Sequence, residues 1–465
     1  MLASIINTFS NCFKIPELKS RIGFTFLLLG ICRLAAYIRL PSINAAALSG
    51  YLASHAAGTG GLLNMYSLFT GGALENCAVG ALGIMPYISA QIVMQLLTAV
   101  VPSLSKLARE DNGRVKIIKY TRYLTILICI GQGAFMAKTW ENPSTIFSGW
   151  DTNLIGNLVV ADNIWWYRIE TVLLLTTGCL LLMWLGEQIT ERGIGNGISL
   201  IITIGILARL PAAFQGLVDT YFTTGGKGNF GNGIVLVALL VAVVAGTIAV
   251  YQAQRKIPVQ YAQRRIGQKV YSGGTSFLPL RLSFAGVMPI IFAQAILMVP
   301  QQVFQYIGAN FPSFHFLMSF SGALSYGAPT YLIIYTLMIL FFSYFWTATQ
   351  FNELQISDDL KKNGGYIPGV RPGVATSNFL HTAMARITLA GAIFLTVIAV
   401  VPIILTTHMQ IPPTVSNFFG GTSLLIIVGV LLDTMRQMES HLMMRHYDGF
   451  LRGGRGGGSR LRGRF

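Results

Sequence analysis

Long apolar runs alternate with short polar segments along almost the whole chain. Each run holds roughly twenty residues, which is the length that an α-helix needs to cross a hydrocarbon core of about 30 Å. The pattern predicts an all-α polytopic membrane protein with ten transmembrane helices. The ten predicted spans are 22–40, 81–101, 117–137, 166–186, 195–213, 234–253, 285–306, 329–350, 384–405 and 419–436.

The composition agrees with this class of protein. Of the 465 residues, 53% are hydrophobic and only 11% are charged, and a soluble domain could not bury that much apolar surface. The 5 cysteines are widely spaced and most of them lie within apolar runs. We therefore expect small core residues rather than disulfides or metal ligands, and we predict no metal or cofactor site.

The lysine and arginine positions predict the orientation. If the N-terminus lies inside, 27 of the 33 Lys and Arg residues fall in inner loops and tails, and Arg33 falls within the first span. The five in outer loops are Arg39, Lys138, Arg168, Arg209 and Lys227. Since cytoplasmic loops carry an excess of positive charge, this asymmetry places both termini in the cytoplasm.

The stretch from Phe69 to Leu97 is too interrupted to be an ordinary span. The interruptions are Gly71, Gly72, Gly80, Gly83 and Pro86. An unpaired backbone group in hydrocarbon costs several kcal/mol, so a broken helix is tolerated only inside protein or beside a watery cavity. We predict a half-helix at about 65–77, then a kink and a membrane helix at about 81–101.

The same sequence pattern returns in the second half of the chain. GIMPYISAQ at 83–91 aligns without a gap with GVMPIIFAQ at 286–294, so that Ile88 corresponds to Ile291. Interrupted helices at matching places indicate inverted repeats with a functional site between them. We predict pseudo-symmetric halves at 22–215 and 216–436. The alternative is a chance match, because membrane segments are built from few residue types.

Two predicted inner loops are unusually long and basic. Alternating Val, Tyr and Thr around 257–261 and 270–276 predict that the loop 254–283 forms a β-hairpin projecting from the membrane. The other loop is 351–383. Both could be ordinary positive-inside loops that touch anionic lipid, but their length favours an anionic partner such as ribosomal RNA or an acidic protein surface.

The two ends of the chain have different patterns. Residues 1–21 place apolar side chains among basic ones, which predicts an amphipathic segment on the inner surface. Residues 437–465 end in a Gly- and Arg-rich tail, and we expect 453–465 to be disordered. This tail could bind nucleic acid, a ribosome or anionic lipid, or simply act as a solubilising segment.

Several blocks of the chain resemble the SecY family, whose members are central subunits of the bacterial protein-conducting channel. They are the stretch from Phe69 to Leu97, MWLGEQITERGIGNGIS at 183–199, YIPGVRPG at 366–373 and FGGTSLLI at 419–426. The resemblance implies a pore between the two halves and a plug half-helix outside it. It also implies a multi-pass protein of the bacterial inner membrane.

The resemblance implies roles for particular residues, position by position. A constricting ring in the pore would consist of Ile84, Ile88, Ile198, Ile202, Ile291 and Ile426. The plug would include Gly71, Gly72, Ala73, Leu74 and Glu75. The helices at 81–101 and 285–306 would form a lateral gate, with Ser89, Gln91 and Gln294 able to hydrogen-bond across it. Docking residues for a ribosome or motor would be Arg255, Lys256, Lys269 and Arg371.

The resemblance also implies partners. It implies the small membrane subunits SecE and SecG, the SecA ATPase, the ribosome, and signal sequences and nascent polypeptides as cargo. Anionic lipids are a further expected contact of the basic loops. The chain itself would be a passive pore rather than an enzyme, because the energy would come from the ribosome or from SecA.

A secondary solute transporter is the alternative function. Transporters place ionisable residues deep within their spans, and here only Arg33 lies clearly inside a predicted span. The residues near estimated span ends are Glu170, Glu187, Glu191, Arg192 and Asp433. The spans also contain no Ser-His-Asp grouping or HExxH motif. A narrow ring of isoleucine would instead exclude water and ions by dewetting while offering no charge to a passing polypeptide.

Overall fold

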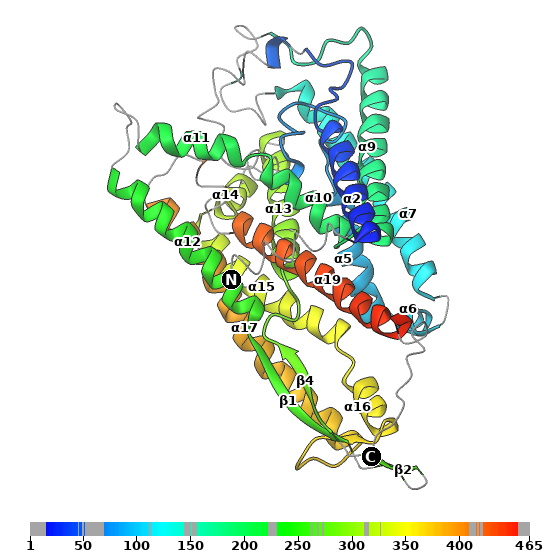
Figure 1. Cartoon of the computed structure of the whole chain (residues 1–465). Coiled ribbons are helices and arrows are strands. Elements are labelled where there is room, and N and C mark those ends of the chain that lie inside the picture. The colour runs from blue at the N-terminus through cyan, green and yellow to red at the C-terminus, as the bar shows by residue number, and fades with distance from the viewer. Residues whose placement is uncertain are drawn as a thin grey trace.

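The computed structural model describes most of the chain. The described residues are 15–44, 46–48, 51, 69–110, 113–143, 150, 156–221, 230–261, 264–266, 269–271, 274–310, 316–325, 327–408, 415, 418 and 422–453. They form a bundle of helices from which a β-hairpin extends at one end (Figure 1). The predicted class, an all-α polytopic membrane protein, is confirmed.

Helices lie at each of the ten predicted spans. In the first half they are α2 (Pro16–Leu34), α5 (Met85–Val100), α7 (Gly113–Glu141), α9 (Ile164–Arg192) and α10 (Gly197–Leu207), which continues into α11 (Leu210–Tyr221). In the second half they are α12 (Phe230–Gln252), α13 (Met288–Asn310), α15 (Pro329–Gln350), α17 (Val374–His408) and α19 (Thr422–Gly453). Shorter helices are α6 (Pro102–Arg109), α14 (Phe316–Ala323) and α16 (Glu353–Lys362).

By length and hydropathy alone, fewer of these helices qualify as spans. Within the described residues, 5 helices are long and apolar enough to cross a membrane, or up to 6 if α5 and α6 are counted as one bent span. These two helices meet at an angle of 104° where Pro102 follows Val101. Proline lacks the N–H that would continue α5, so the chain turns there. The count of ten spans is consistent with the structure.

The predicted hairpin is present, and it is part of a larger unit. Strand β1 (Gln254–Tyr261) pairs antiparallel with β4 (Thr275–Arg281), and β2 (Arg264–Ile266) pairs with β3 (Lys269–Tyr271) at the tip. On its other edge β1 pairs with β5 (Gly365–Tyr366), which belongs to the second basic loop. The two basic loops therefore form one structure.

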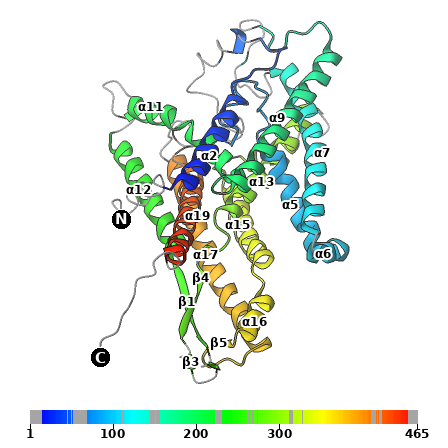
Figure 2. The same cartoon turned by 45° about the vertical axis from the view of Figure 1, so that its right-hand side comes forward.

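An apolar core fixes this unit to the bundle. Ile257 and Val259 of β1 and Leu280 of β4 are buried against Leu380 and Met384 of α17. Inward side chains therefore alternate with exposed ones along β1, as expected for a strand with one buried face. Figure 2 shows the hairpin lying beside the lower ends of α16 and α17.

The two repeated segments start their helices in the same way. Gly83 has φ 57° and Gly286 has φ 62°, and α5 and α13 begin two residues later at Met85 and Met288. A residue in the left-handed region stops the preceding chain from being helical, and glycine adopts this conformation without steric cost. Each helix has proline at its second position, where a missing N–H costs nothing.

Three features differ from the sequence predictions. Helix α2 begins at Pro16 and so crosses the boundary drawn at 21–22, while 1–14 lie outside the described residues. Helix α19 continues through 437–453 into the segment assigned to the tail, while 454–465 lie outside the described residues. Of the predicted half-helix at 65–77, residues 65–68 also lie outside the described residues, and 71–77 form turns because Gly71, Gly72 and Cys77 have positive φ.

Candidate functional site

A cavity of about 240 Å³ lies where the two halves of the bundle meet. It is bounded by helices α5, α10, α13 and α15. Four of the six predicted ring residues line it, namely Ile88, Ile198, Ile202 and Ile291. Ile88, Ile202 and Ile291 are each 1–2% exposed, so the isoleucines are packed closely and leave no wide opening.

The turn before α10 sets the position of two of these isoleucines. Asn196 caps α10, and its side-chain oxygen accepts hydrogen bonds from the backbone N–H groups of Ile198 and Ser199. The cap fixes the first turn of the helix, so that Ile198 and Ile202 lie one turn apart on the same face. A side chain at Gly197 would overlap the carbonyl oxygen of Gly186, so α9 and the start of α10 can pack this closely only with glycine.

The remaining two predicted ring residues do not line this cavity. Ile84 is the N-cap residue of α5 and is 2% exposed, and Ile426 in α19 is 0% exposed. Both belong to the same apolar core as the other four. They lie in the packed layer around the cavity rather than on its surface.

The rest of the cavity wall combines Met288, Phe292 and Trp346 with five polar side chains, and its described residues are uncharged. Gln91 and Gln95 come from α5, Asn196 and Ser199 from the α10 turn, and Gln350 from α15. The side-chain oxygen of Gln95 is buried without a hydrogen-bond partner. Sequence reasoning missed Gln95, Trp346 and Gln350; only Gln95 carried a signal, because it lies one turn after Gln91 on an apolar helix.

Helices α5 and α13 pack against each other, which forms the seam predicted for the gate. Ser89 and Gln91 are half-buried, and Gln294 is 3% exposed. Among the residues that the structure describes, no hydrogen bond joins Ser89 or Gln91 to Gln294, and the Gln294 side-chain oxygen has no hydrogen-bond partner. The predicted bonds across the seam are therefore not formed in this arrangement.

The segment from Phe69 to Ile84, in front of α5, packs against the end of α2. The Leu40 N–H donates to the Cys77 carbonyl at 3.1 Å, the Val79 N–H to the Ile38 carbonyl at 2.8 Å and the Gly80 N–H to the Ala35 carbonyl at 3.1 Å. These backbone bonds satisfy polar groups that would otherwise be buried unpaired. The five predicted plug residues, 71–75, form the turns at the start of this anchored segment.

Two arginines reach this segment from the surrounding helices. The Arg209 guanidinium lies 2.7 Å from the Glu75 carboxylate, and the side chains are 23% and 22% exposed. Arg33, near the end of α2, donates a hydrogen bond to the Gly71 carbonyl at 3.0 Å and lies over the Tyr37 ring. Arg33, which the sequence placed alone in a span, therefore has partners.

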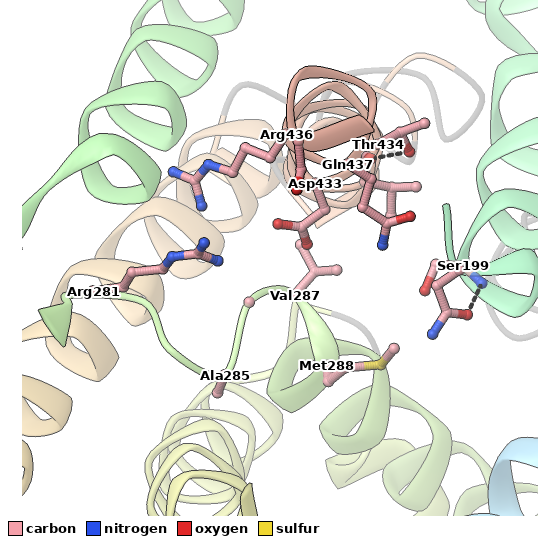
Figure 3. A pocket seen from close by; sticks show the side chains of 13 residues that line it. Ser199, Arg281, Ala285, Val287, Met288, Asp433, Thr434, Arg436 and Gln437 are labelled. Atoms are coloured by element: carbon pink, nitrogen blue, oxygen red, sulfur yellow. Dashed lines mark hydrogen bonds between the residues drawn. The ribbon is translucent and has the colours of Figure 1, made fainter. Parts of the chain in front are cut away.

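A second cavity, of about 410 Å³, adjoins the first and shares Asn196, Ser199 and Met288 with it. Its wall also includes three charged residues, Arg281 from the end of β4 and Asp433 and Arg436 from α19 (Figure 3). The site thus has an apolar part at the isoleucines and a polar part toward the hairpin.

One charged residue of this second cavity has a clear structural partner. Arg436 donates a hydrogen bond to the Tyr251 carbonyl, in the last turn of α12. A cation at a helix C-terminus satisfies a free carbonyl and complements the helix dipole. Arg436 therefore fastens α12 to α19.

The predicted docking residues gather on the protruding unit. Arg255 and Lys256 are exposed on β1, Arg371 is exposed in the turn before α17, and Lys269 begins β3. The Arg371 carbonyl accepts a hydrogen bond from the Thr376 hydroxyl at 2.9 Å, which orders this turn. Positive side chains from both basic loops therefore share one rigid support.

Charged residues of α7 and α9 near the span ends are paired with each other. Arg122 makes two hydrogen bonds to Glu187, at 3.2 and 2.7 Å, and Arg168 makes two to Glu141, at 2.7 and 2.8 Å.

Four of the five cysteines are described, and all four are buried and free. No group of His, Cys, Asp or Glu side chains able to hold a metal occurs in the described part of the chain.

Comparison with known proteins gives a consistent family. A family model described as SecY matches residues 78–435. The protein translocase subunit SecY of Chlamydia trachomatis is 41% identical over 451 residues, which cover 96% of this chain and 98% of that relative.

Solved structures share the fold. One is described as "The plug domain of the SecY protein stablizes the closed state of the translocation channel and maintains a membrane seal"; it has a TM-score of 0.57, 18% identity, and coverage of 90% of this chain and 91% of that one. Another, Sec61 in the canine ribosome-channel complex, has a TM-score of 0.56, 17% identity and the same coverage.

Proposed function

This chain belongs to the SecY family, and we propose that it forms a protein-conducting channel. The channel passes unfolded secretory polypeptides across the membrane and releases transmembrane segments sideways into lipid. It is a passive pore and not an enzyme. This proposal extends the name that the curated relative carries, protein translocase subunit, to this chain.

The observation that carries the proposal is the isoleucine-lined cavity between the two halves. Four isoleucines from three helices converge there, and none of the described residues that line this cavity is charged. A narrow apolar constriction blocks water and ions by dewetting, yet it holds no charge that would retain a passing polypeptide. Ile84 and Ile426, packed behind the cavity wall, complete the ring when the helices separate.

The seam between α5 and α13 acts as the lateral gate. Ser89, Gln91 and Gln294 present polar groups there without binding each other across it. Hydrogen bonds between membrane helices average well under 2 kcal/mol, so polar groups at a seam add little resistance to opening. A signal sequence enters between the two helices, and an apolar segment then partitions into lipid.

The energy comes from partners that dock on the hairpin unit. The exposed Arg255, Lys256 and Arg371, together with Lys269, suit ribosomal RNA or an acidic surface on SecA. The fold shared with Sec61 from a ribosome-channel complex supports the ribosome as one partner. The small subunits SecE and SecG complete the channel, and anionic lipids contact the basic loops.

The protein lies in the bacterial inner membrane with both termini in the cytoplasm. This orientation rests on the distribution of lysine and arginine and puts the hairpin unit on the cytoplasmic side. A secondary transporter is less consistent with the site. Transport sites hold ionisable groups near the midplane, whereas the wall around the isoleucines is apolar or amide-lined in the described residues.

The proposal is tested by conductance in a planar lipid bilayer. The purified full-length protein, with the subunits that accompany it, should be nearly silent without substrate. Deleting residues 65–75 should cause frequent openings, because the segment that covers the ring is removed. A deletion variant that stays silent while a small solute crosses the membrane would instead favour the transporter.

Docking is tested separately by reversing charge on the hairpin unit. Combining Lys256→Glu with Arg371→Glu should weaken ribosome or SecA binding about tenfold, because two cations facing an anionic surface are inverted, and should flatten its salt dependence. Lys106→Glu, at an exposed position of α6, is the matched control and should leave binding unchanged. Equal binding by all three proteins would refute docking at this unit.

A further inference from the structure

The plug segment, residues 69–84, makes its backbone hydrogen bonds and its ion pair with the N-terminal half of the bundle. Its contacts come from α2, through Arg33 and the backbone of 35–40, and from the end of α10, through Arg209. Both helices belong to the N-terminal half. When the two halves separate, these contacts do not have to break, so something in them must set how readily the segment leaves.

Most of these contacts are made by the backbone and would be the same for many sequences. The ion pair between Glu75 and Arg209 is different, because it depends on two particular side chains. Its length is 2.7 Å, and both side chains are about four-fifths buried. An ion pair in such a place is screened less by water and salt than one on the surface.

Arg209 is positioned for this contact by its own backbone. It lies in the turn that joins α10 to α11, where its N–H donates to the Ile206 carbonyl at 3.1 Å and its carbonyl accepts from the Ala213 N–H at 3.0 Å. The Arg209 Nε atom is buried without a hydrogen-bond partner, so the guanidinium depends on Glu75 for its compensation. Losing Glu75 would leave a partly buried cation unpaired, which is unfavourable.

Close packing holds the same segment against α10. A methyl group built on Gly71 would lie 2.8 Å from the Cα atom of Gly205, and one built on Gly205 would lie 3.1 Å from the Phe69 carbonyl oxygen. Two glycines thus allow the backbone of the segment to touch the helix. This approach brings Glu75 within reach of Arg209 at the end of that helix.

We propose that the Glu75–Arg209 ion pair is a charge latch that holds the plug segment in its closed position and sets how often the resting channel opens. Arg33, bound to the Gly71 carbonyl, is a second positioning residue at the other end of the segment. The inference rests on the proposed channel function and adds to it the residues that control resting closure. Breaking the latch frees the plug segment without altering the isoleucine ring.

The test is a charge-swap series measured as resting conductance of the full-length protein in a planar bilayer. Glu75→Arg and Arg209→Glu should each raise the open probability about tenfold, equivalent to about 1.4 kcal/mol. The double variant, Glu75→Arg with Arg209→Glu, should return close to the wild-type value. If exchanging the two charges restores the wild-type open probability, the two residues act as an ion pair. Two independent structural losses would instead add up in the double variant.

A matched control removes an ion pair of similar burial from the same half. Arg168 and Glu141 lie 2.7 Å apart, with side chains 33% and 14% exposed, and this ion pair joins α9 to α7 rather than to the plug segment. Glu141→Gln should leave the resting conductance unchanged while lowering thermal stability as much as Glu75→Gln does. Equal conductance increases in Glu141→Gln and Glu75→Gln would overturn the latch.

The deletion of residues 65–75 separates the two possible failures. If the deletion opens the channel but the single charge variants do not, the latch is wrong and the channel function stands. If neither the deletion nor the charge variants open the channel, the channel function itself fails. Single variants that open the channel with a double variant that opens it further would also refute the ion pair.

Discussion

Helices α5 and α13 begin alike but follow very different segments. Gly83 and Gly286 have nearly the same positive φ, and the helices start at Met85 and Met288. Helix α13 follows β4 at the hairpin end of the bundle and leads away from it to α14, whereas α5 leads toward α6 at the lower side of the bundle (Figure 1). The two helices therefore run in opposite directions, as expected for inverted repeats.

The difference lies in what precedes each start. The segment before Gly83 is folded into turns against α2 and α10, whereas the segment before Gly286 leads directly from the end of β4. The first repeat is thus preceded by a segment folded against α2 and α10, and the second by the β-hairpin. The two repeats share the way in which the helix begins, and the segments in front of them differ.

The largest expected effect comes from a change in the plug segment. Gly71→Ala places a methyl group at φ 63°, where it would overlap Arg33 and lie 2.8 Å from the Gly205 Cα atom. The strain of a left-handed backbone costs about 1–2 kcal/mol, and the clash adds to it. The free energy of unfolding should therefore fall by about 3 kcal/mol, and the channel should open more often. Thermal unfolding in detergent and resting conductance measure the two effects.

Gly364→Ala is the control for strain without a clash. Its φ is 70°, and nothing lies within 4 Å of the added methyl group. It should cost about 1–2 kcal/mol and leave the resting conductance unchanged. A Gly71→Ala variant as stable and as silent as Gly364→Ala would show that the tight approach to α10 is unimportant.

The second effect compares the two helix starts directly. A methyl group on Gly83 would lie 3.0 Å from the Thr70 side chain, whereas one on Gly286 would lie 3.5 Å from the nearest atom, the Tyr251 hydroxyl oxygen. Gly286→Ala should therefore lower the free energy of unfolding by about 1 kcal/mol from backbone strain alone, and Gly83→Ala should lower it by about 1 kcal/mol more. The shift in unfolding temperature of each variant gives the ranking, and a larger loss for Gly286→Ala would reverse our interpretation.

The smallest effect should be the same in both halves. Pro86→Ala and Pro289→Ala each replace the second residue of a helix and give the unfolded chain more conformational freedom. Each should lower the free energy of unfolding by about 0.5 kcal/mol. Both side chains are buried, so the lost packing should also be similar. Unfolding temperatures that differ by several degrees between the two variants would mean that the starts are not equivalent.

Local patterns in the sequence predicted the elements that depend on local chemistry. The repeat at 83–91 and 286–294 predicted two matching helix starts, and the alternation around 257–261 and 270–276 predicted the hairpin. The resemblance of several blocks to the SecY family predicted four isoleucines that do line one cavity. In these places a short pattern dictates the backbone, so sequence alone was sufficient.

Contacts between distant segments could not be predicted in this way. The pairing of β5 with β1 joins residues about a hundred positions apart, and two residues of strand carry too little pattern to be recognised. Cys77 adopts φ 45° because the surrounding turns require it, although cysteine has no preference for that region. Trp346 and Gln350 reach the cavity through the packing of α15 against α13, which no local signal encodes.

The length of α17 determines how far the hairpin unit stands from the lipid. The helix has 35 residues and is therefore about 52 Å long, whereas a hydrocarbon core is about 30 Å thick. About 20 Å of helix must stand clear of the hydrocarbon, and the buried contacts of β1 and β4 are made to this overhang. If a partner docks on the hairpin unit as proposed, this overhang holds the partner about 20 Å from the hydrocarbon and leaves room for a chain to reach the lipid headgroups.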